Sequence, residues 1–229
     1  MKFQIAIDGP SGVGKSATAQ KVANALDFLY VNTGFLFRGL AYVFQQKKLA
    51  NPQITIEQMI EELRKQQNFA SVDNQIYYQK KLINDFLSNS EIAKLSSELS
   101  QNLNIRNFIL DLERQIANNQ QVVMEGRDIG TVVLPNAFLK IFLTASVDVR
   151  AQRRFSELKR MGKLNNQSLD EIKYEISMRD EKDRNRELAP LLKAEDAIEI
   201  LTDNLDLEEV VLKIVGIFLE KLKTSYPNN

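Results

Sequence analysis

Five short runs of apolar residues recur along the chain, and each is apolar almost throughout instead of alternating with polar residues. They are Phe3–Ile7, Phe28–Val31, Val122–Glu125, Leu139–Thr144 and Ala197–Leu201. A strand covered by helices on both faces has this pattern, whereas a strand with one wet face alternates. Because helical stretches separate the runs, the pattern predicts an α/β fold with a parallel five-stranded sheet and helices on both faces.

The helices between these runs are predicted from their apolar spacing and from their capping residues. Ala17–Leu26 has a helical spacing of apolar residues, and Ser146 begins a helix that continues through Arg154. Ser168 and Glu171 form a capping box that opens another helix. The last helix starts near Asp206, and its apolar stripe is ordinary core spacing.

The distance between the second and third runs is far more than one crossover helix requires. Within it, Thr55–Gln58 is a capping box, Phe69–Tyr78 has the pattern of a hairpin, and Glu91–Asn118 returns to a helical pattern. We therefore expect an inserted α+β subdomain at 53–95, and a core made of 1–52 and 96–229. Residues 227–229 are expected to form a frayed tail.

Composition excludes several kinds of chemistry. Lys plus Arg and Asp plus Glu are 30 each, which argues against a protein that coats nucleic acid or an anionic membrane. With no Cys and no His, disulfides, thiolate metal sites and histidine bases are excluded. No apolar run approaches the roughly 18 residues of a membrane span, and the first residues lack a signal-peptide pattern, so a cytoplasmic location is expected.

The chemistry is most strongly indicated by a glycine-rich segment that fits G-x-x-x-x-G-K-[ST] and lies between the first strand and its helix. Backbone N–H groups and the positive end of the helix dipole converge at such a turn and favour phosphate. We expect Lys15 to reach the β- and γ-phosphates of a nucleoside triphosphate and the Ser16 hydroxyl to hold Mg²⁺. The residues of this triphosphate loop are Gly9, Pro10, Ser11, Gly12, Val13, Gly14, Lys15, Ser16 and Ala17.

Three further clusters carry candidate residues. Asn32–Arg38 follows the second strand, and Glu125–Gly130 follows the third, at the edge where open α/β sheets bind ligands. Glu125 is suited to orient Mg²⁺ through water. The basic run 150–186 suits a lid of about 153–168 that closes cations over a transferred phosphoryl group. Within the run, Arg179, Asp183 and Arg186 have the spacing of one helical face.

Taken together, these segments resemble the bacterial cytidylate kinase family of nucleoside monophosphate kinases. The matching segments occur in the family's order: Ile7–Lys15, Asn32–Gly34 with Arg38, Glu125–Val133, and Arg179–Leu191. The phosphate loop alone is generic, whereas the block Gly126–Val133 together with the insertion is specific. The resemblance implies a P-loop NTPase-type fold with a monophosphate-binding insertion and a helical lid. It also implies Mg²⁺-dependent phosphoryl transfer from ATP to CMP or dCMP by a monomer.

The resemblance also assigns residues. Those it places at CMP are Thr33, Arg38, Ser97, Arg106, Arg127, Asp128, Arg179, Asp183 and Arg186. By this analogy Ser97, Arg106 and Asp128 face cytosine. Arg179 and Asp183 face the ribose. Arg38, Arg127 and Arg186 face the phosphate. The catalytic cations are expected to be Lys15, Arg127, Arg153, Arg154, Arg179 and Arg186.

The chain departs from the family pattern at Asn32, Phe35, Phe37, Glu125 and Lys182, for which we expect changed rate constants and not a lost activity. Two other functions remain open from the residues. One is a kinase for another small acceptor, such as UMP, AMP or shikimate. The other is a non-catalytic ATP-binding switch.

Overall fold

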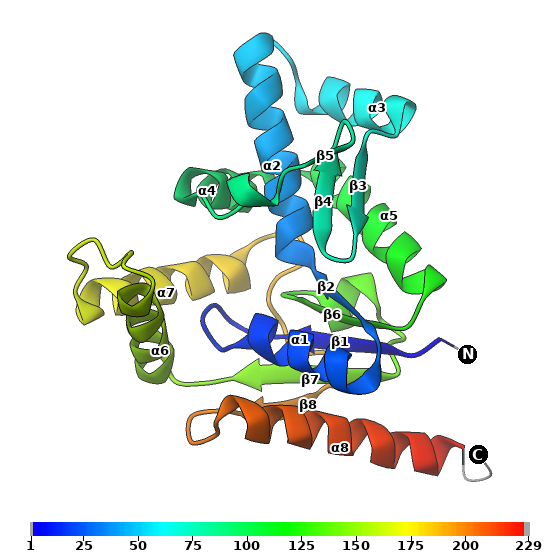
Figure 1. The fold of residues 1–229 in the computed structure, drawn as a ribbon, viewed down its shortest axis with the longest axis vertical. Coiled ribbons are helices and arrows are strands. Elements are labelled where there is room, and N and C mark those ends of the chain that lie inside the picture. The colour runs from blue at the N-terminus through cyan, green and yellow to red at the C-terminus, as the bar shows by residue number, and fades with distance from the viewer. Residues whose placement is uncertain (1, 227–229) are drawn as a thin grey trace. The chain divides into compact units, whose positions relative to one another are not determined.

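The computed structural model of the chain describes residues 2–226, and all five apolar runs form strands within it (Figure 1). The strands are β1 (Gln4–Asp8), β2 (Leu29–Asn32), β6 (Val122–Gly126), β7 (Leu139–Thr144) and β8 (Ile198–Leu201). They form one sheet in the order β2-β6-β1-β7-β8. The pairs β1–β6, β1–β7 and β7–β8 are parallel. The predicted α/β fold is confirmed, and the expected frayed tail at 227–229 lies outside the described residues.

The chain divides into two compact units, the first made of residues 1–29 and 121–229 and the second of residues 30–120. In the first unit, the helices are α1 (Lys15–Leu26), α6 (Val147–Arg160), α7 (Leu169–Asn185) and α8 (Leu207–Ser225). Helix α1 packs on α8 and on the sheet, and α6 packs on α7. A π-helical turn, η2 (Ile129–Val133), follows β6.

The second unit is built from helices around a small antiparallel sheet. Its elements are α2 (Thr33–Ala50), α3 (Ile56–Gln66), β3 (Phe69–Val72), β4 (Gln75–Tyr78), β5 (Lys81–Leu82), the 3₁₀ turn η1 (Asn84–Phe86), α4 (Ser90–Leu99) and α5 (Leu103–Asn119). The strand order is β3-β4-β5. The predicted hairpin is confirmed, and Asp73 and Asn74 at its turn have left-handed backbones, with φ of 48° and 62°.

The predicted helix Glu91–Asn118 is wrong as one element, because the chain breaks between α4 and α5. The Asn102 side chain caps α5 by accepting hydrogen bonds from the backbone N–H groups of Asn104 and Ile105. An Asn that accepts from backbone groups starts a new helix, and the apolar periodicity alone did not indicate it. The predicted capping boxes at Thr55 and Ser168 are both present.

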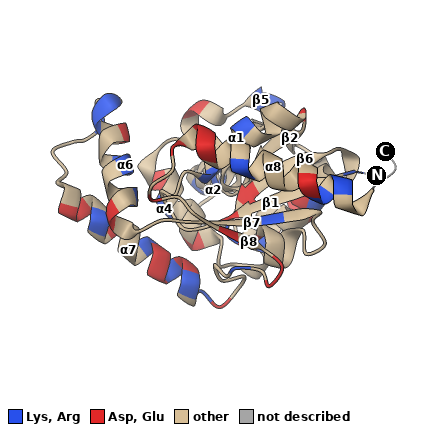
Figure 2. Cartoon of the chain, turned by 90° about the horizontal axis from the view of Figure 1, so that it is seen from below, with Lys and Arg blue, Asp and Glu red and all other residues tan. Residues whose placement is uncertain are grey.

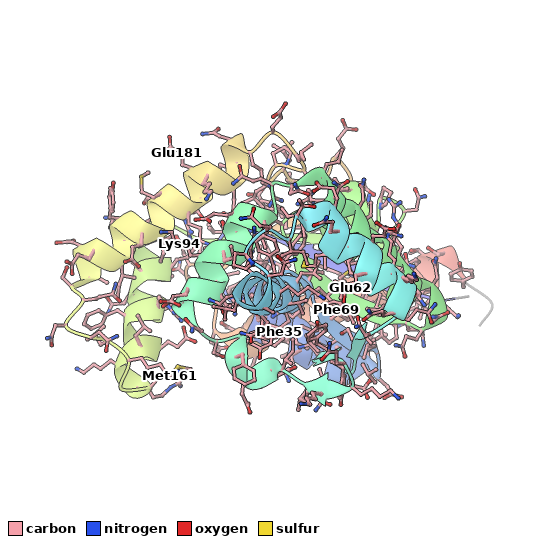
Figure 3. All side chains as sticks on the ribbon, turned by 90° about the horizontal axis from the view of Figure 1, so that it is seen from above. Phe35, Glu62, Phe69, Lys94, Met161 and Glu181 are labelled. Carbon is pink, nitrogen blue, oxygen red and sulfur yellow. The ribbon has the colours of Figure 1, made fainter. Side chains whose placement is uncertain are left out.

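The second unit is wider than the 53–95 segment predicted as an insertion. Its hydrophobic core includes Leu36 and Leu40 of α2 and Ile105 and Ile109 of α5, together with residues of the hairpin. Figure 3 labels Phe35 on α2 and Phe69 on β3, which both belong to this apolar cluster. Because these helices bury their apolar faces against the hairpin, they form one compact unit with it. Whether 53–95 is a functional subdomain remains a prediction.

Throughout residues 2–226, no helix combines the length and the apolar character that crossing a membrane requires.

Candidate active site

The glycine-rich loop joins the carboxyl end of β1 to the first turn of α1. Gly12 and Gly14 have φ of 75° and 97°, a left-handed conformation that favours glycine. Gly14 is the N-cap of α1, and no side chain caps that helix end. Gly9 has no space for a side chain, because a Cβ there would lie 2.3 Å from the Leu143 carbonyl oxygen on β7. The loop thus presents backbone N–H groups and the positive end of α1 to an anion.

Lys15 is buried, with 5% of its surface exposed, and its Nζ donates to the Pro10 carbonyl oxygen at 2.8 Å. The pKa of Lys15 is lowered to about 7, mainly by burial and then by the charge of Arg127, whereas Glu125 and Asp8 oppose the shift. A triphosphate placed at the loop supplies the anionic charge that stabilises the ammonium form.

Ser16 and Glu125 meet across the carboxyl ends of β1 and β6. The Ser16 Oγ donates to Glu125 Oε1 at 2.5 Å, and Glu125 is buried. A hydroxyl and a carboxylate are the oxygen ligands that Mg²⁺ takes in phosphoryl-transfer sites, so these residues fit the metal. Residues 2–226 contain no group of three or more His, Cys, Asp or Glu side chains arranged to hold an ion. Two protein ligands are enough for Mg²⁺ when phosphate oxygens and waters complete its shell.

Asp8, the last residue of β1, holds the turn that follows β6. Its two carboxylate oxygens accept the backbone N–H groups of Ile129 at 2.9 Å and of Gly130 at 2.7 Å. The pKa of Asp8 is raised to about 6. Burial is the largest cause and the charge of Asp128 adds to it, whereas the two hydrogen bonds lower the pKa. The sequence reading did not single out Asp8, although its place between a buried strand and the phosphate loop marked it.

Four residues predicted from the resemblance meet on this side of the first unit. Arg127 Nε donates to Asp183 Oδ2 at 2.8 Å, and Arg186 Nη2 donates to Asp128 Oδ1 at 3.2 Å. All four side chains are largely buried. Two guanidinium groups held next to two carboxylates suit a ligand that carries both a phosphate and hydrogen-bond donors.

The prediction that Arg179, Asp183 and Arg186 share one helical face is wrong for Arg186. Helix α7 ends at Asn185, and Arg186 is its C-cap, with an extended backbone. Its Nε donates to the Ala189 carbonyl oxygen at 2.5 Å, so Arg186 is oriented by the chain beyond the helix. Arg179 lies on α7 and is exposed.

The structure does not bring Arg153 and Arg154 together with these residues. Arg153 donates to the Thr202 hydroxyl at 3.0 Å, to the Thr202 carbonyl at 2.6 Å and to the Leu205 carbonyl at 3.3 Å. Arg154 is exposed and pairs with Glu157 at 2.7 Å. Neighbouring residues of a helix point in directions about 100° apart, which separates the two guanidinium groups. Figure 2 shows that positive and negative residues are interspersed along α6 and α7.

The remaining predicted residues belong to the second unit. Thr33 is the buried first residue of α2, and Ser97 is on α4. Arg38 lies over the Phe35 ring at 5.8 Å and donates to the Leu87 carbonyl at 3.4 Å. Arg106 lies over the Phe37 ring at 5.8 Å and donates to the Ser100 carbonyl at 3.3 Å.

Two family departures, Phe35 and Phe37, therefore contact two of the predicted CMP-binding arginines. A third departure, Asn32, forms hydrogen bonds within the second unit. Its backbone N–H donates to Asn74 Oδ1 at 2.8 Å, and its side-chain amide donates to the Tyr30 hydroxyl at 3.2 Å.

The fold and the site together define a P-loop phosphotransferase. The sheet is parallel, a glycine-rich phosphate loop follows β1, the loop contains a buried lysine, and a hydroxyl–carboxylate pair lies beside the loop. The cytidylate kinase family model matches residues 5–220. The chain is 46% identical to the cytidylate kinase of Alkaliphilus oremlandii over 95% of this chain and 98% of that protein. It is 42% identical to the cytidylate kinase of Mycoplasmoides gallisepticum, over 97% of this chain and 96% of that protein.

Among solved structures, TT1252 from Thermus thermophilus has the same fold, with a TM-score of 0.50, 15% identity, and coverage of 96% of this chain and 98% of that one. The chain belongs to the cytidylate kinase family, and it is a nucleoside monophosphate kinase.

Proposed function

We propose that this enzyme transfers the γ-phosphoryl group of ATP to CMP or dCMP, giving ADP and CDP or dCDP. Family membership supports the acceptor. The observation that carries the proposal is the set of contacts at the carboxyl ends of the paired strands β1 and β6. The loop lysine and the Ser16–Glu125 pair lie at these ends, and so do Arg127 and Asp128, paired to Asp183 and Arg186.

On the donor side, the loop of residues 9–17 binds the triphosphate through backbone N–H groups. Pro10 has none, and the Ser11 N–H donates to Asp180 instead. Lys15 exchanges its bond to the Pro10 carbonyl for the β- and γ-phosphates. Ser16 holds Mg²⁺, and Glu125 orients the ion through a water. When bound, Mg²⁺ neutralises charge on the phosphate oxygens.

On the acceptor side, Arg38, Arg127 and Arg186 bind the CMP phosphate, and Arg179 and Asp183 bind the ribose. Asp128, Ser97 and Arg106 bind the cytosine base. Thr33 is the remaining CMP-binding residue. An oxygen of the CMP phosphate is already anionic at neutral pH, so the transfer needs no general base. Positioning and charge neutralisation carry the catalysis, which accounts for an active enzyme without histidine.

Arg153 and Arg154 act in the lid of about 153–168 when both nucleotides are bound. For Arg153 this requires release from its three acceptors at Thr202 and Leu205. The enzyme works as a cytoplasmic monomer, without nucleic acid or membrane partners.

Base selectivity is the sharpest test. Cytosine presents an amino donor at the 4-position and uracil a carbonyl acceptor, so an ionised Asp128 accepts from the first and repels the second. Asp128→Asn offers both a donor and an acceptor. We expect the ratio of kcat/KM for CMP over UMP to fall by about tenfold or more, because leaving a buried group unpaired costs about 1–3 kcal/mol and 1.4 kcal/mol is tenfold.

A matched control is Asp111→Asn, which removes an exposed carboxylate of the second unit that pairs with Arg64. It should leave the ratio unchanged. An Asp128→Asn enzyme with the parental ratio contradicts base reading by Asp128.

An acceptor screen separates the alternatives. If UMP, AMP or shikimate is phosphorylated in preference to CMP, that compound is the acceptor and CMP is not. ATP binding without CMP-dependent ADP release would favour a nucleotide-binding switch.

A further inference from the structure

A buried ion pair lies beside the phosphate loop, and the proposed function uses neither of its residues. Arg150 of α6 and Asp180 of α7 are 2% and 3% exposed, and their Nη1 and Oδ2 atoms are 2.5 Å apart. The sequence analysis placed both residues in the charged run 150–186, and Asp180 also in the family-matching segment Arg179–Leu191, but it assigned neither a role.

Both residues bind the same peptide unit of the loop. Arg150 Nη1 donates to the Ser11 carbonyl oxygen at 2.8 Å, and the Ser11 N–H donates to Asp180 Oδ1 at 3.1 Å. Arg150 Nε also donates to the Ala145 carbonyl at 3.0 Å, just beyond β7. The backbone groups of Ser11 are thereby fixed on both sides to the helices α6 and α7.

The contact continues to the next residue of the loop. A Cβ on Gly12 would lie 3.5 Å from Arg150 Cβ and 3.7 Å from Ile176 Cδ1, so the loop packs directly on these side chains. Asp180 extends the buried stripe of α7 that contains Ile172 and Ile176, and that stripe packs on α6. The loop therefore rests on the polar end of the α6–α7 interface.

We infer that Arg150 and Asp180 are positioning residues that hold the phosphate loop in the shape that binds ATP. A loop with left-handed glycines loses much backbone freedom when it orders, and a loop that is already held loses less on binding. The pair also makes the order of the loop depend on the packing of α6 against α7. This inference rests on the proposed role of the loop as the ATP site.

Stability alone does not account for the pair. Buried ion pairs are often replaceable by apolar residues of similar volume without loss of stability, whereas removing one partner leaves an uncompensated charge. Replacing both residues by apolar ones removes their bonds to Ser11 without leaving an unpaired buried charge. An effect on nucleotide binding can then be separated from an effect on folding. The same two helices offer a control in the exposed pair between Lys173 and Asp148.

The test compares the parent, Arg150→Met/Asp180→Leu, and the control Asp148→Asn/Lys173→Gln. Calorimetry measures the Kd of ADP and, in separate titrations, of CMP without a second nucleotide. Steady-state assays measure KM for ATP and kcat. For the apolar double variant we expect the Kd of ADP and the KM of ATP to rise about tenfold or more, with the Kd of CMP within twofold of the parent. The control should keep all parental values.

Parental ADP affinity in a folded double variant overturns the inference, and so does an equal loss of CMP affinity, which indicates general disruption. Thermal unfolding monitors the fold. Should the double variant not fold, Arg150→Lys keeps the charge but loses the fork that binds Ser11, Asp180 and Ala145 together. A several-fold rise in the KM of ATP for Arg150→Lys supports the inference, and an unchanged KM overturns it. If the parent itself releases no ADP in response to CMP, the proposed function fails instead.

Discussion

The carboxyl ends of β1 and β6 hold four buried ionisable residues: Asp8, Lys15, Glu125 and Asp128. Burial disfavours the charged form of such groups, and it is the largest cause of the pKa shifts of Asp8 and Lys15. A buried charge costs stability unless hydrogen bonds or opposite charges offset its desolvation, and groups with perturbed pKa values cluster at functional sites. Here Lys15 and Glu125 are bonded to the loop, Asp8 to the turn after β6, and Asp128 to Arg186.

Asp8 has a pH dependence with a definite sign. Its pKa is raised from 3.8 to about 6, so the folded state binds its proton more tightly than the unfolded state does. Its contribution to stability is therefore present below about pH 4 and is lost as the pH rises through 6. For Asp8→Asn, which does not titrate, we expect the stability difference, parent minus variant, to fall by on the order of 2–3 kcal/mol between pH 4 and pH 7.

Urea unfolding at a series of pH values measures this difference, since titrations shared by both proteins cancel. A pH-independent offset is also expected, because the amide replaces one of the two acceptors for Ile129 and Gly130. A stability difference that is constant across the range would show that the pKa of Asp8 is not raised on folding.

At the scale of elements, the second unit depends on a close approach between α2 and its hairpin. Gly39 faces the hairpin, where a Cβ would lie 2.7 Å from Ile76 Cγ2 and 3.0 Å from Phe69 Cζ. We expect Gly39→Ala to lower the free energy of unfolding, because overpacking costs about 1–3 kcal/mol and helix propensity returns at most about 1 kcal/mol. Urea unfolding at neutral pH measures the change.

The control is Gly216→Ala in the interior of α8, where a Cβ meets no atom within 4 Å. With open space around it, the added methyl group should raise the free energy of unfolding by about 0.5–1 kcal/mol. If both substitutions stabilise the protein by similar amounts, the tight contact of Gly39 does not limit packing.

At the scale of the whole molecule, the residues proposed to bind CMP are divided between the two units. Arg38 belongs to the second and Arg127 to the first. Lysine keeps the charge at either position but not the planar fork that binds phosphate oxygens in pairs. We expect Arg38→Lys and Arg127→Lys each to raise the KM of CMP about tenfold or more, with the KM of ATP within about threefold, in a coupled assay of ADP release.

Arg64→Lys is the matched control in the second unit, because Arg64 pairs with Asp111 and lies over the Phe108 ring. It should keep both KM values. An effect from only one of the two test substitutions would assign acceptor binding to the unit that carries it.

Much of the fold was accessible to sequence reasoning because it depends on local signals. The five strands were predicted within a residue or so, since a strand covered on both faces is apolar throughout. The capping boxes at Thr55 and Ser168 were readable because a cap bonds residues only three apart. The phosphate loop was readable for the same reason, since its glycines, Lys15 and Ser16 act within one turn.

Tertiary structure decided what depends on residues far apart in the chain. It showed that α2 and α5 share a core with the hairpin, that Arg153 is bound at Thr202, and that Asp8 holds the turn after β6. It also showed that Arg150 and Asp180, to which the sequence analysis assigned no role, both bind the backbone of Ser11 in the phosphate loop. The role of a buried charged residue depends on its hydrogen-bond and ion-pair partners. For Asp180 these partners, Arg150 and Ser11, lie 30 and 169 positions away in the sequence.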